Sequence, residues 1–212
     1  GAGYTGLWTA YYLIRADPSL RVAVVEAEQA GFGASGRNGG WASALFPASL
    51  AALARQSTRD AAIRMKQAMH ASVDEIGRVA AAEGWQIGWA KGGTVVAARS
   101  PLQLRRAREE VAELRSWGFG PADYDLLDAA EAGRRMGATD VLGAVFTPHC
   151  AAIDPARLVR SLARTVVESG VRLYENTPAT AIEPGRVRTS LGDVTAPVVV
   201  RAISNDVRKS AL

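Results

Sequence analysis

Clusters of apolar residues, separated by glycine, proline and polar residues, divide the chain into candidate helices and strands. The apolar spacing predicts a helix over residues 7–16, which ends because Pro18 disfavours the helical conformation at Asp17. A run rich in β-branched residues predicts a buried strand over 21–28. Residues 31–40 contain five glycines, so we expect them to form a shaped loop rather than a helix or a strand.

The remaining helices are predicted by alanine content and by capping residues. Residues 48–83 are rich in alanine and predict two helices or one broken helix. Residues 100–118 and 154–170 each begin with a capping side chain followed by proline and end at glycine, as complete helices do. A shorter helix is expected over 128–136. The other predicted strands cover residues 93–98, 124–128, 143–148, 171–175, 179–183, 186–190 and 196–204.

The order of these elements predicts the fold class. Strands alternate with helices at both ends of the chain, whereas the middle of the chain is more mixed. This order is typical of an α/β domain with a doubly wound, Rossmann-like sheet that carries an inserted α+β region. With 212 residues, of which 48% are hydrophobic, the chain is large enough to bury the core that such a fold needs.

The composition bears on which binding partners and which cellular compartment we expect for the protein. The net charge is +4, but the basic residues alternate with acids, as in residues 105–115, so we expect solvated helix faces and no nucleic-acid partner. The one cysteine, Cys150, cannot form an intrachain disulfide, which fits a reducing compartment and predicts a cytoplasmic protein. No apolar run approaches the roughly 18 residues that span a bilayer, so we expect no membrane span.

The first residues of the chain carry a nucleotide-binding signal. Gly1, Gly3 and Gly6 form the pattern G-x-G-x-x-G at the start of a predicted helix, whose N–H groups and dipole favour a pyrophosphate. Glu26 ends the next predicted strand, twenty residues after Gly6, where an acid accepts hydrogen bonds from a ribose. The strand that precedes such glycines is absent from the sequence, so we expect a chain truncated at this end.

The second glycine-rich segment bears on the choice of nucleotide. Glu26 favours a ribose with a free 2′-hydroxyl, which fits NAD or FAD rather than NADP. Residues 31–40 follow closely and let the backbone approach a large ligand, while Ser35, Arg37 and Asn38 supply donors for phosphate and for a carbonyl-bearing ring. This loop favours FAD, and an NAD-dependent dehydrogenase stays as an alternative.

Three segments together resemble a known family: "GAGYTGLWTAYYL", "VAVVEAE" and "GFGASGRNGGW" are similar to the flavin-dependent D-amino-acid oxidase superfamily, in its γ-glutamylputrescine-oxidase-like branch. Residues 151–163 and 170–183 resemble the return of that family's chain into its flavin domain. The resemblance implies FAD as cofactor and an amine or amino acid as substrate. It implies hydride transfer to flavin N5, an imine product, and reoxidation by oxygen, with release of hydrogen peroxide, or by another electron acceptor.

The resemblance also implies domains and cofactor contacts. Residues 1–88 would be the first part of an FAD-binding domain, 89–150 part of a substrate domain and 151–212 the return segment; a further C-terminal portion would be missing. The implied contacts are Gly1, Gly3, Tyr4, Thr5 and Gly6 at the pyrophosphate, Glu26 and Ala27 at the ribose, Ala34, Ser35, Arg37, Asn38, Gly39 and Gly40 along the pyrophosphate and flavin, and Ala179 at the adenine, with Ala202 as a weaker candidate.

No catalytic residue can be assigned from the sequence. His70 is interpreted as a packing residue, while Trp41 and the His149–Cys150 pair are weak candidates for a site. The chain has one cysteine and only two histidines, and the histidines lie far apart in the sequence, so we expect no metal site. Two alternatives to an amine oxidase remain: an FAD-dependent dehydrogenase with another electron acceptor, and a catalytically silent nucleotide-binding module.

Overall fold

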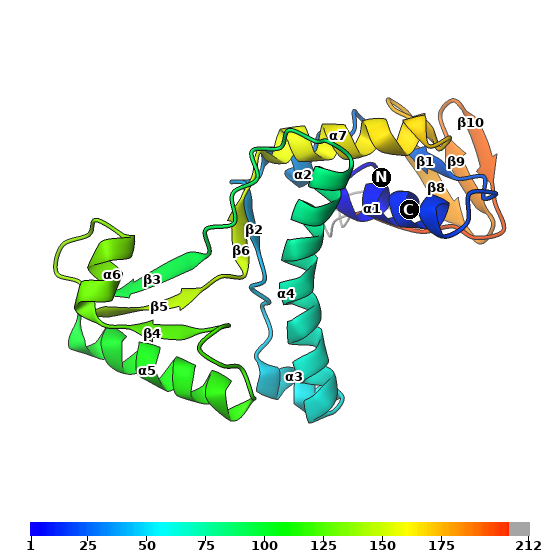
Figure 1. Cartoon of the computed structure of the whole chain (residues 1–212). Helices are drawn as coiled ribbons and strands as arrows, with labels where there is room; N and C mark the ends of the chain where they lie inside the picture. Colours follow the sequence, from blue (N-terminus) through cyan, green and yellow to red (C-terminus); the bar gives the residue numbers. More distant parts are fainter. Residues whose placement is uncertain (204–212) are drawn as a thin grey trace. The chain divides into compact units, whose positions relative to one another are not determined.

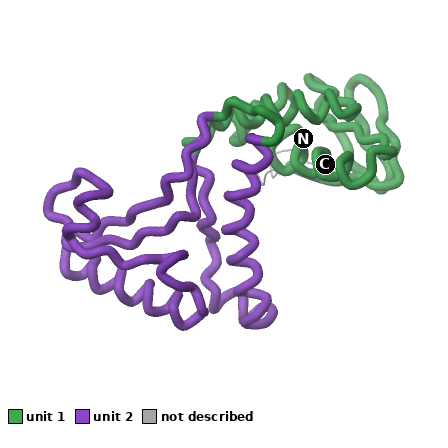
Figure 2. Tube along the Cα trace, viewed as in Figure 1, with its two compact units in different colours: residues 1–40, 82–87, 154–212 green, residues 41–81, 88–153 purple. Residues whose placement is uncertain are grey.

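The computed structural model describes residues 1–203, which form a mixed α/β fold (Figure 1). The chain divides into two compact units (Figure 2). The first unit contains Gly1–Gly40, Ala82–Ile87 and the described part of Asp154–Leu212, and the second contains Trp41–Ala81 and Gly88–Ile153. These divisions differ from the expected domain boundaries, because residues 41–81 lie with the second unit rather than with the glycine-rich N-terminal segment.

The first unit packs two amphipathic helices beside a parallel strand pair. Helix α1 (Tyr4–Ala16) buries Leu7, Ala10 and Ile14, which share one face of the helix. Helix α7 (Pro155–Glu168) lies alongside and buries Leu158, Leu162 and Val166 (Figure 1). Strand β1 (Ala23–Val25) pairs in parallel with β7 (Arg172–Tyr174), so the sheet places the end of β1 next to the end of β7.

A small antiparallel sheet completes the first unit. It consists of β8 (Ala179–Glu183), β9 (Arg186–Thr189) and β10 (Gly192–Thr195) in the order β10-β9-β8. The short helix α2 (Ala34–Arg37) also belongs to this unit and packs on α7. These elements hold residues 1–40 and Ala179 in one compact body.

The second unit is built on the antiparallel sheet β3-β5-β4, formed by Thr94–Ala98, Gly143–Thr147 and Asp125–Leu127. Helix α5 (Pro101–Ser116) covers this sheet through Ala107 and Val111, which pack on Val145. Helix α6 (Ala129–Arg135) buries Ala132 against the same sheet. The remaining elements are α3 (Leu50–Gln56), α4 (Arg59–Ala82) and the antiparallel pair of β2 (Trp41–Ser43) and β6 (Cys150–Ala152).

Most predicted elements are confirmed, including the capped helices and the division of residues 48–83 into two helices. The Ser100 side chain accepts a hydrogen bond from Gln103 N at 3.2 Å, and Asp154 accepts one from Arg157 N at 2.9 Å. Gly118 and Gly170 end their helices in the left-handed region, with φ of 96° and 93°. No helix in the described residues is long and apolar enough to cross a membrane.

Two predictions are wrong. Residues 31–40 were expected to lack helix, but Ala34–Arg37 forms one helical turn, whose carbonyls accept hydrogen bonds from Asn38 Nδ2. Residues 196–203 form no strand, because no neighbouring strand pairs with them in the described part of the chain. Residue 204 of that predicted strand lies outside the described residues. Strands β2, β6 and β10 were not predicted.

Candidate cofactor-binding site

The start of α1 presents backbone N–H groups that suit an anionic ligand. Gly3 is the N-cap and has no side chain to satisfy them, and the first turn contains no acidic residue. The N–H of Tyr4 donates to Ser35 Oγ at 3.0 Å, which ties the second glycine-rich segment to the helix start. The first N–H groups of an α-helix have no partner within the helix, and they carry the positive end of its dipole. The predicted pyrophosphate contacts therefore lie where a phosphate is favoured.

Two glycines of this region are required by close approach of the backbone. A Cβ atom on Gly6 would lie 2.0 Å from the carbonyl oxygen of Gly1, and one on Gly36 would lie 2.3 Å from the carbonyl oxygen of Gly31. In both cases the obstructing atom is backbone, which cannot rotate away as a side chain could. The two turns can therefore close as they do only with glycine at these positions.

Glu26 joins the end of β1 to the first glycine turn. Its Oε2 atom accepts a hydrogen bond from Ala2 N at 2.6 Å, and its Oε1 atom accepts one from Glu28 N at 3.1 Å. The side chain is partly exposed, and each carboxylate oxygen has a second lone pair that can accept a hydrogen bond. The carboxylate is thus held in one orientation and can still accept a bond from a ribose hydroxyl.

The predicted adenine contact, Ala179, follows a segment that is hydrogen-bonded to the residues after β1. Asn176 N donates to the carbonyl of Glu28, and Thr177 N donates to the carbonyl of Glu26, each at 2.8 Å. These bonds hold the segment that leads into β8 against the end of β1. Ala179, the first residue of β8, therefore follows a segment bonded to the residues on either side of Ala27.

The second glycine-rich loop is stabilised largely by its own side chains. Asn38 Nδ2 donates to the carbonyls of Ala34 and Ser35 at 3.1 Å, and Asn38 Oδ1 accepts from Gly40 N at 2.9 Å. The Arg37 guanidinium lies over the Phe32 ring, 4.1 Å from its centroid. Asn38 therefore shapes the loop through its amide, a role that the sequence did not suggest, whereas Gly39 stays exposed.

Tyr4 and Thr5, two of the predicted pyrophosphate contacts, differ from each other in their surroundings. The Tyr4 hydroxyl donates to the carbonyl of Pro155 at 2.9 Å, so its side chain connects α1 to the start of α7. Burial raises the pKa of this hydroxyl. Thr5 is exposed on the first turn of α1. Both the N–H and the hydroxyl of Tyr4 therefore have partners within the chain, Ser35 and Pro155.

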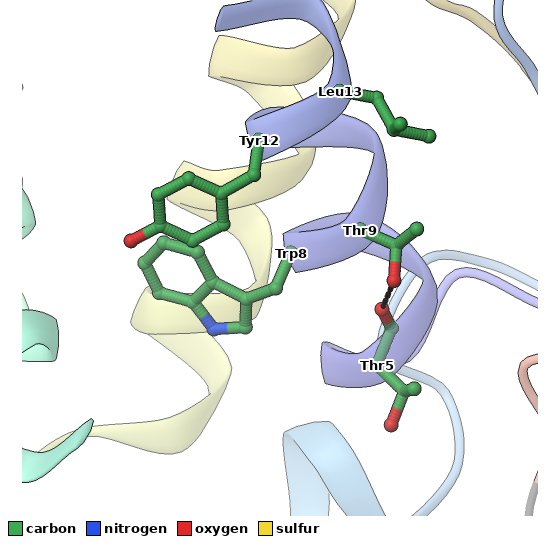
Figure 3. Close-up of a pocket in the computed structure, with 5 residues that line it drawn as sticks. All are labelled: Thr5, Trp8, Thr9, Tyr12 and Leu13. Carbon is green, nitrogen blue, oxygen red and sulfur yellow. Dashed lines mark hydrogen bonds between the residues drawn. The ribbon is translucent and has the colours of Figure 1, made fainter. Parts of the chain in front are cut away.

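An open groove lies along α1 and is lined by Thr5, Trp8, Thr9, Tyr12 and Leu13 (Figure 3). The Trp8 and Tyr12 rings are stacked, with centroids 5.7 Å apart. The Thr9 hydroxyl donates to the carbonyl of Thr5 at 2.7 Å, so this hydroxyl proton is already used within the helix. The groove has a largely apolar lining, and no carboxylate, histidine, lysine or cysteine is among the residues that line it.

The second unit brings together residues that are distant in the sequence. His70 on α4 is buried, and its ring stacks on that of His149 with centroids 3.5 Å apart. Burial lowers the pKa of His70 to about 4. His149 Nε2 lies 3.0 Å from Asp123 Oδ1. The expectation that sequence separation keeps the two histidines apart is wrong, because α4 and the turn between β5 and β6 meet in this unit.

The two other weak site candidates belong to the second unit as well. Trp41 follows the second glycine-rich loop, and its indole N–H donates to Thr94 Oγ1 at 3.3 Å while 56% of the residue is exposed. Cys150 is buried, with 2% of its surface accessible, as expected for a small core residue. Neither residue has a contact that assigns it a chemical step.

These features define a class of protein, and comparison with known proteins agrees with it. The residues at the start of α1 fit a dinucleotide, because they combine glycine turns, the N–H groups of a helix start and an anchored carboxylate. Residues 1–204 match the family described as FAD dependent oxidoreductase, DAO. The chain belongs to this family, whose cofactor is FAD.

The chain is similar in sequence or in structure to several known proteins. It is 33% identical over 208 residues to gamma-glutamylputrescine oxidoreductase of Escherichia coli, covering 95% of this chain and 47% of that protein. The structure of L-proline dehydrogenase from P. horikoshii matches with a TM-score of 0.75 at 18% identity, covering 95% of this chain and 50% of that one. Glycine oxidase from Geobacillus kaustophilus matches with a TM-score of 0.66 at 24% identity, over 93% and 52%. The chain spans about half the length of the curated relatives it matches.

Proposed function

We propose that this chain forms the FAD-binding part, and a portion of the substrate-binding part, of an enzyme that oxidises an amine or an amino acid. The first unit would be the Rossmann-like FAD-binding domain, and the second would contribute to the substrate domain. The observation that carries the proposal is the Glu26 carboxylate, fixed by the Ala2 N–H at 2.6 Å beside the start of α1, whose N-cap is a glycine. Membership of the FAD dependent oxidoreductase family supports it.

Each part of the first unit has a role in this proposal. The N–H groups at the start of α1 bind the pyrophosphate, and Glu26 accepts a hydrogen bond from the adenosine ribose. Ser35 holds the second glycine-rich loop on the helix start, and Asn38 keeps that loop in shape along the cofactor. Ala27 and Ala179 border the adenosine with backbone groups and small side chains. Gly39 and Gly40 let the backbone approach the flavin.

FAD, when bound, supplies the acceptor for the hydride that leaves the substrate carbon next to nitrogen. We propose an amine substrate, because the relative from Escherichia coli is named for gamma-glutamylputrescine and is 33% identical over most of this chain. The resemblance to the oxidase branch supports oxygen as the electron acceptor and hydrogen peroxide as the second product.

The proposal is tested with the full-length protein by visible absorption and by anaerobic addition of amines and amino acids. Flavin absorption bands that bleach with an amine, followed by hydrogen peroxide release on admission of air, are the expected result. Bleaching without oxygen consumption in air would replace the oxidase with a dehydrogenase that uses another acceptor. A protein that neither carries FAD nor takes it up would contradict the proposal and leave a silent nucleotide-fold module.

A further inference from the structure

Both histidines of the chain lie in one cluster of the second unit, together with an aspartate. His70 comes from α4, His149 from the turn between β5 and β6, and Asp123 from the segment before β4. Asp123 Oδ1 lies 3.0 Å from His149 Nε2 and 3.8 Å from His70 Nδ1. Two imidazoles and one carboxylate therefore meet although 26 residues or more separate each of them along the chain.

Tyr124 orients one of the two rings. His70 Nε2 lies 2.8 Å from the Tyr124 hydroxyl, and both side chains are buried. When Nε2 carries the proton and donates to this hydroxyl, the lone pair is on Nδ1, the nitrogen nearer to Asp123. A hydrogen bond from the second ring nitrogen is the usual way in which a metal-binding histidine is held.

The distances within the cluster suit one metal ion. Metal bonds of about 2.0 Å in a tetrahedral site place neighbouring ligand atoms about 3.3 Å apart. The two distances from Asp123 Oδ1, 3.0 and 3.8 Å, lie on either side of this value. One ligand atom from each of the three residues lies within 4.8 Å of the others.

One ring nitrogen of the cluster has no partner, and one side of the cluster is partly open to solvent. His149 Nδ1 is buried and has no hydrogen-bond partner among residues 1–203, which is unusual for a buried polar atom. About a third of the Asp123 side chain is exposed, at 32%, so an ion can enter from that side. Among the nearby charges, Asp74 favours a cation and Lys66, which lies over the Tyr124 ring, opposes it.

We propose that His70, Asp123 and His149 bind one divalent transition-metal ion of the zinc, cobalt and nickel class. Imidazole nitrogens favour these ions over calcium and magnesium, which prefer oxygen ligands. The stacked rings tilt apart on binding, because the lone pairs of two parallel rings do not converge on one ion. The ion would join α4, the segment before β4 and the turn between β5 and β6, and this role is independent of the flavin.

The test is a titration of the full-length protein, without a polyhistidine tag, with Co²⁺. Visible cobalt bands that saturate at one equivalent per chain are expected. Asp123→Asn and His149→Gln should weaken Co²⁺ binding at least about tenfold. Asp140→Asn is the matched control, since 83% of the Asp140 side chain is exposed and it lies outside the cluster. Equal affinities for wild type and Asp123→Asn would overturn the proposal.

Two further measurements keep the test decisive if a variant fails to fold. The imidazole ¹⁵N signals of His70 and His149 in the wild-type protein should change together on addition of Zn²⁺ and stop changing at one equivalent. Unchanged signals with excess Zn²⁺ would overturn the proposal. Cys150→Ser should bind Co²⁺ as the wild type does, whereas a sulfur-to-cobalt charge-transfer band in the wild type would place the ion on Cys150 instead.

Discussion

The two units contain two sites of opposite construction. In the first unit the candidate cofactor site consists mainly of backbone N–H groups and glycine turns, with Glu26 and Ser35 as the side chains that fix them. In the second unit the cluster of His70, Asp123 and His149 consists of side chains from three distant segments. A backbone site needs glycine at fixed spacing, so it leaves a pattern in the sequence. A side-chain site assembled by packing leaves none.

The two sites also differ in how they treat charge. The helix start of the first unit favours an anion, and the only carboxylate fixed against it among the described residues is Glu26, which accepts hydrogen bonds from Ala2 N and Glu28 N. In the second unit, burial lowers the pKa of His70 to about 4, so this imidazole is neutral near pH 7. The first site is suited to phosphate, whereas the second presents a neutral imidazole, the form in which histidine binds metal ions.

Gly6→Ala is expected to give the largest effect and tests the backbone character of the first site. The new Cβ would lie 2.0 Å from the Gly1 carbonyl oxygen, so the turn must shift. Overpacking of this kind costs about 1–3 kcal/mol. If FAD binds only when the turn has its present shape, this cost is subtracted from the binding free energy, and FAD affinity should fall about tenfold to hundredfold. The higher helix propensity of alanine opposes this loss in part. Flavin fluorescence during FAD titration measures the change. Gly33→Ala is the control, since no atom lies within 4 Å of its Cβ; an equal loss in both variants would contradict the account.

Glu26→Gln should have the next largest effect and tests the anchored carboxylate. The variant keeps an oxygen that can accept from Ala2 N but loses the charge that strengthens this bond and the bond to ribose. We expect a loss of about 1–2 kcal/mol in FAD binding, measured by the same titration. Glu28→Gln, at an exposed position two residues away, should bind FAD as the wild type does. An unchanged affinity in Glu26→Gln would remove this residue from the site.

Acidification should affect the second unit through His70. Its folded pKa is about 4, below the usual 6.5, so the unfolded chain binds the proton first as pH falls. The stability that the neutral ring contributes is complete above about pH 6.5 and is lost as pH falls toward 4, at no more than about 1.4 kcal/mol per pH unit. Asp123 and Asp74 oppose this shift, while Lys66 and His149 add to it. Urea unfolding at pH 7 and pH 5, with a chelator present, measures this loss of stability. If a His70→Gln variant loses as much unfolding free energy between the two pH values as the wild type does, His70 is not the cause.

Helix capping should give the smallest effect and shows what the two units share. Ser100 caps α5 in the second unit as Asp154 caps α7 in the first. Ser100→Ala should lower the free energy of unfolding by about 1 kcal/mol. Ser100→Asp should retain most of the stability, because its carboxylate can accept from the same Gln103 N–H. Urea unfolding distinguishes the two variants; equal losses would show that the cap hydrogen bond is not the cause.

The sequence predicted the elements and residues that depend on local chemistry. Capped helices such as α5 and α7 were predicted because serine or aspartate before proline marks a helix start. Glu26 was singled out by its spacing after the glycines, and it directly follows β1. The three-residue strands β2 and β6 were missed, because such short segments show no alternation and exist through their pairing. Residues 196–203 show the converse, since a β-branched sequence without a paired neighbour in the described chain forms no strand.

The roles of individual side chains were harder to predict. Asn38 was expected to donate to a ligand, yet its amide is engaged with Ala34, Ser35 and Gly40. The Tyr4 hydroxyl is engaged with Pro155, 151 residues away. The stacking of His70 on His149 depends on how α4 packs within the second unit. Each of these contacts is set by tertiary packing, which residue types and spacing do not encode.

The most direct test of the central claim is a crystal structure of the full-length protein with FAD bound. The account predicts that the pyrophosphate lies against the first turn of α1, within hydrogen-bond distance of its N–H groups, and that a ribose hydroxyl donates to Glu26. A structure in which the pyrophosphate lies away from residues 1–6, or in which Glu26 makes no contact with the ribose, would contradict it.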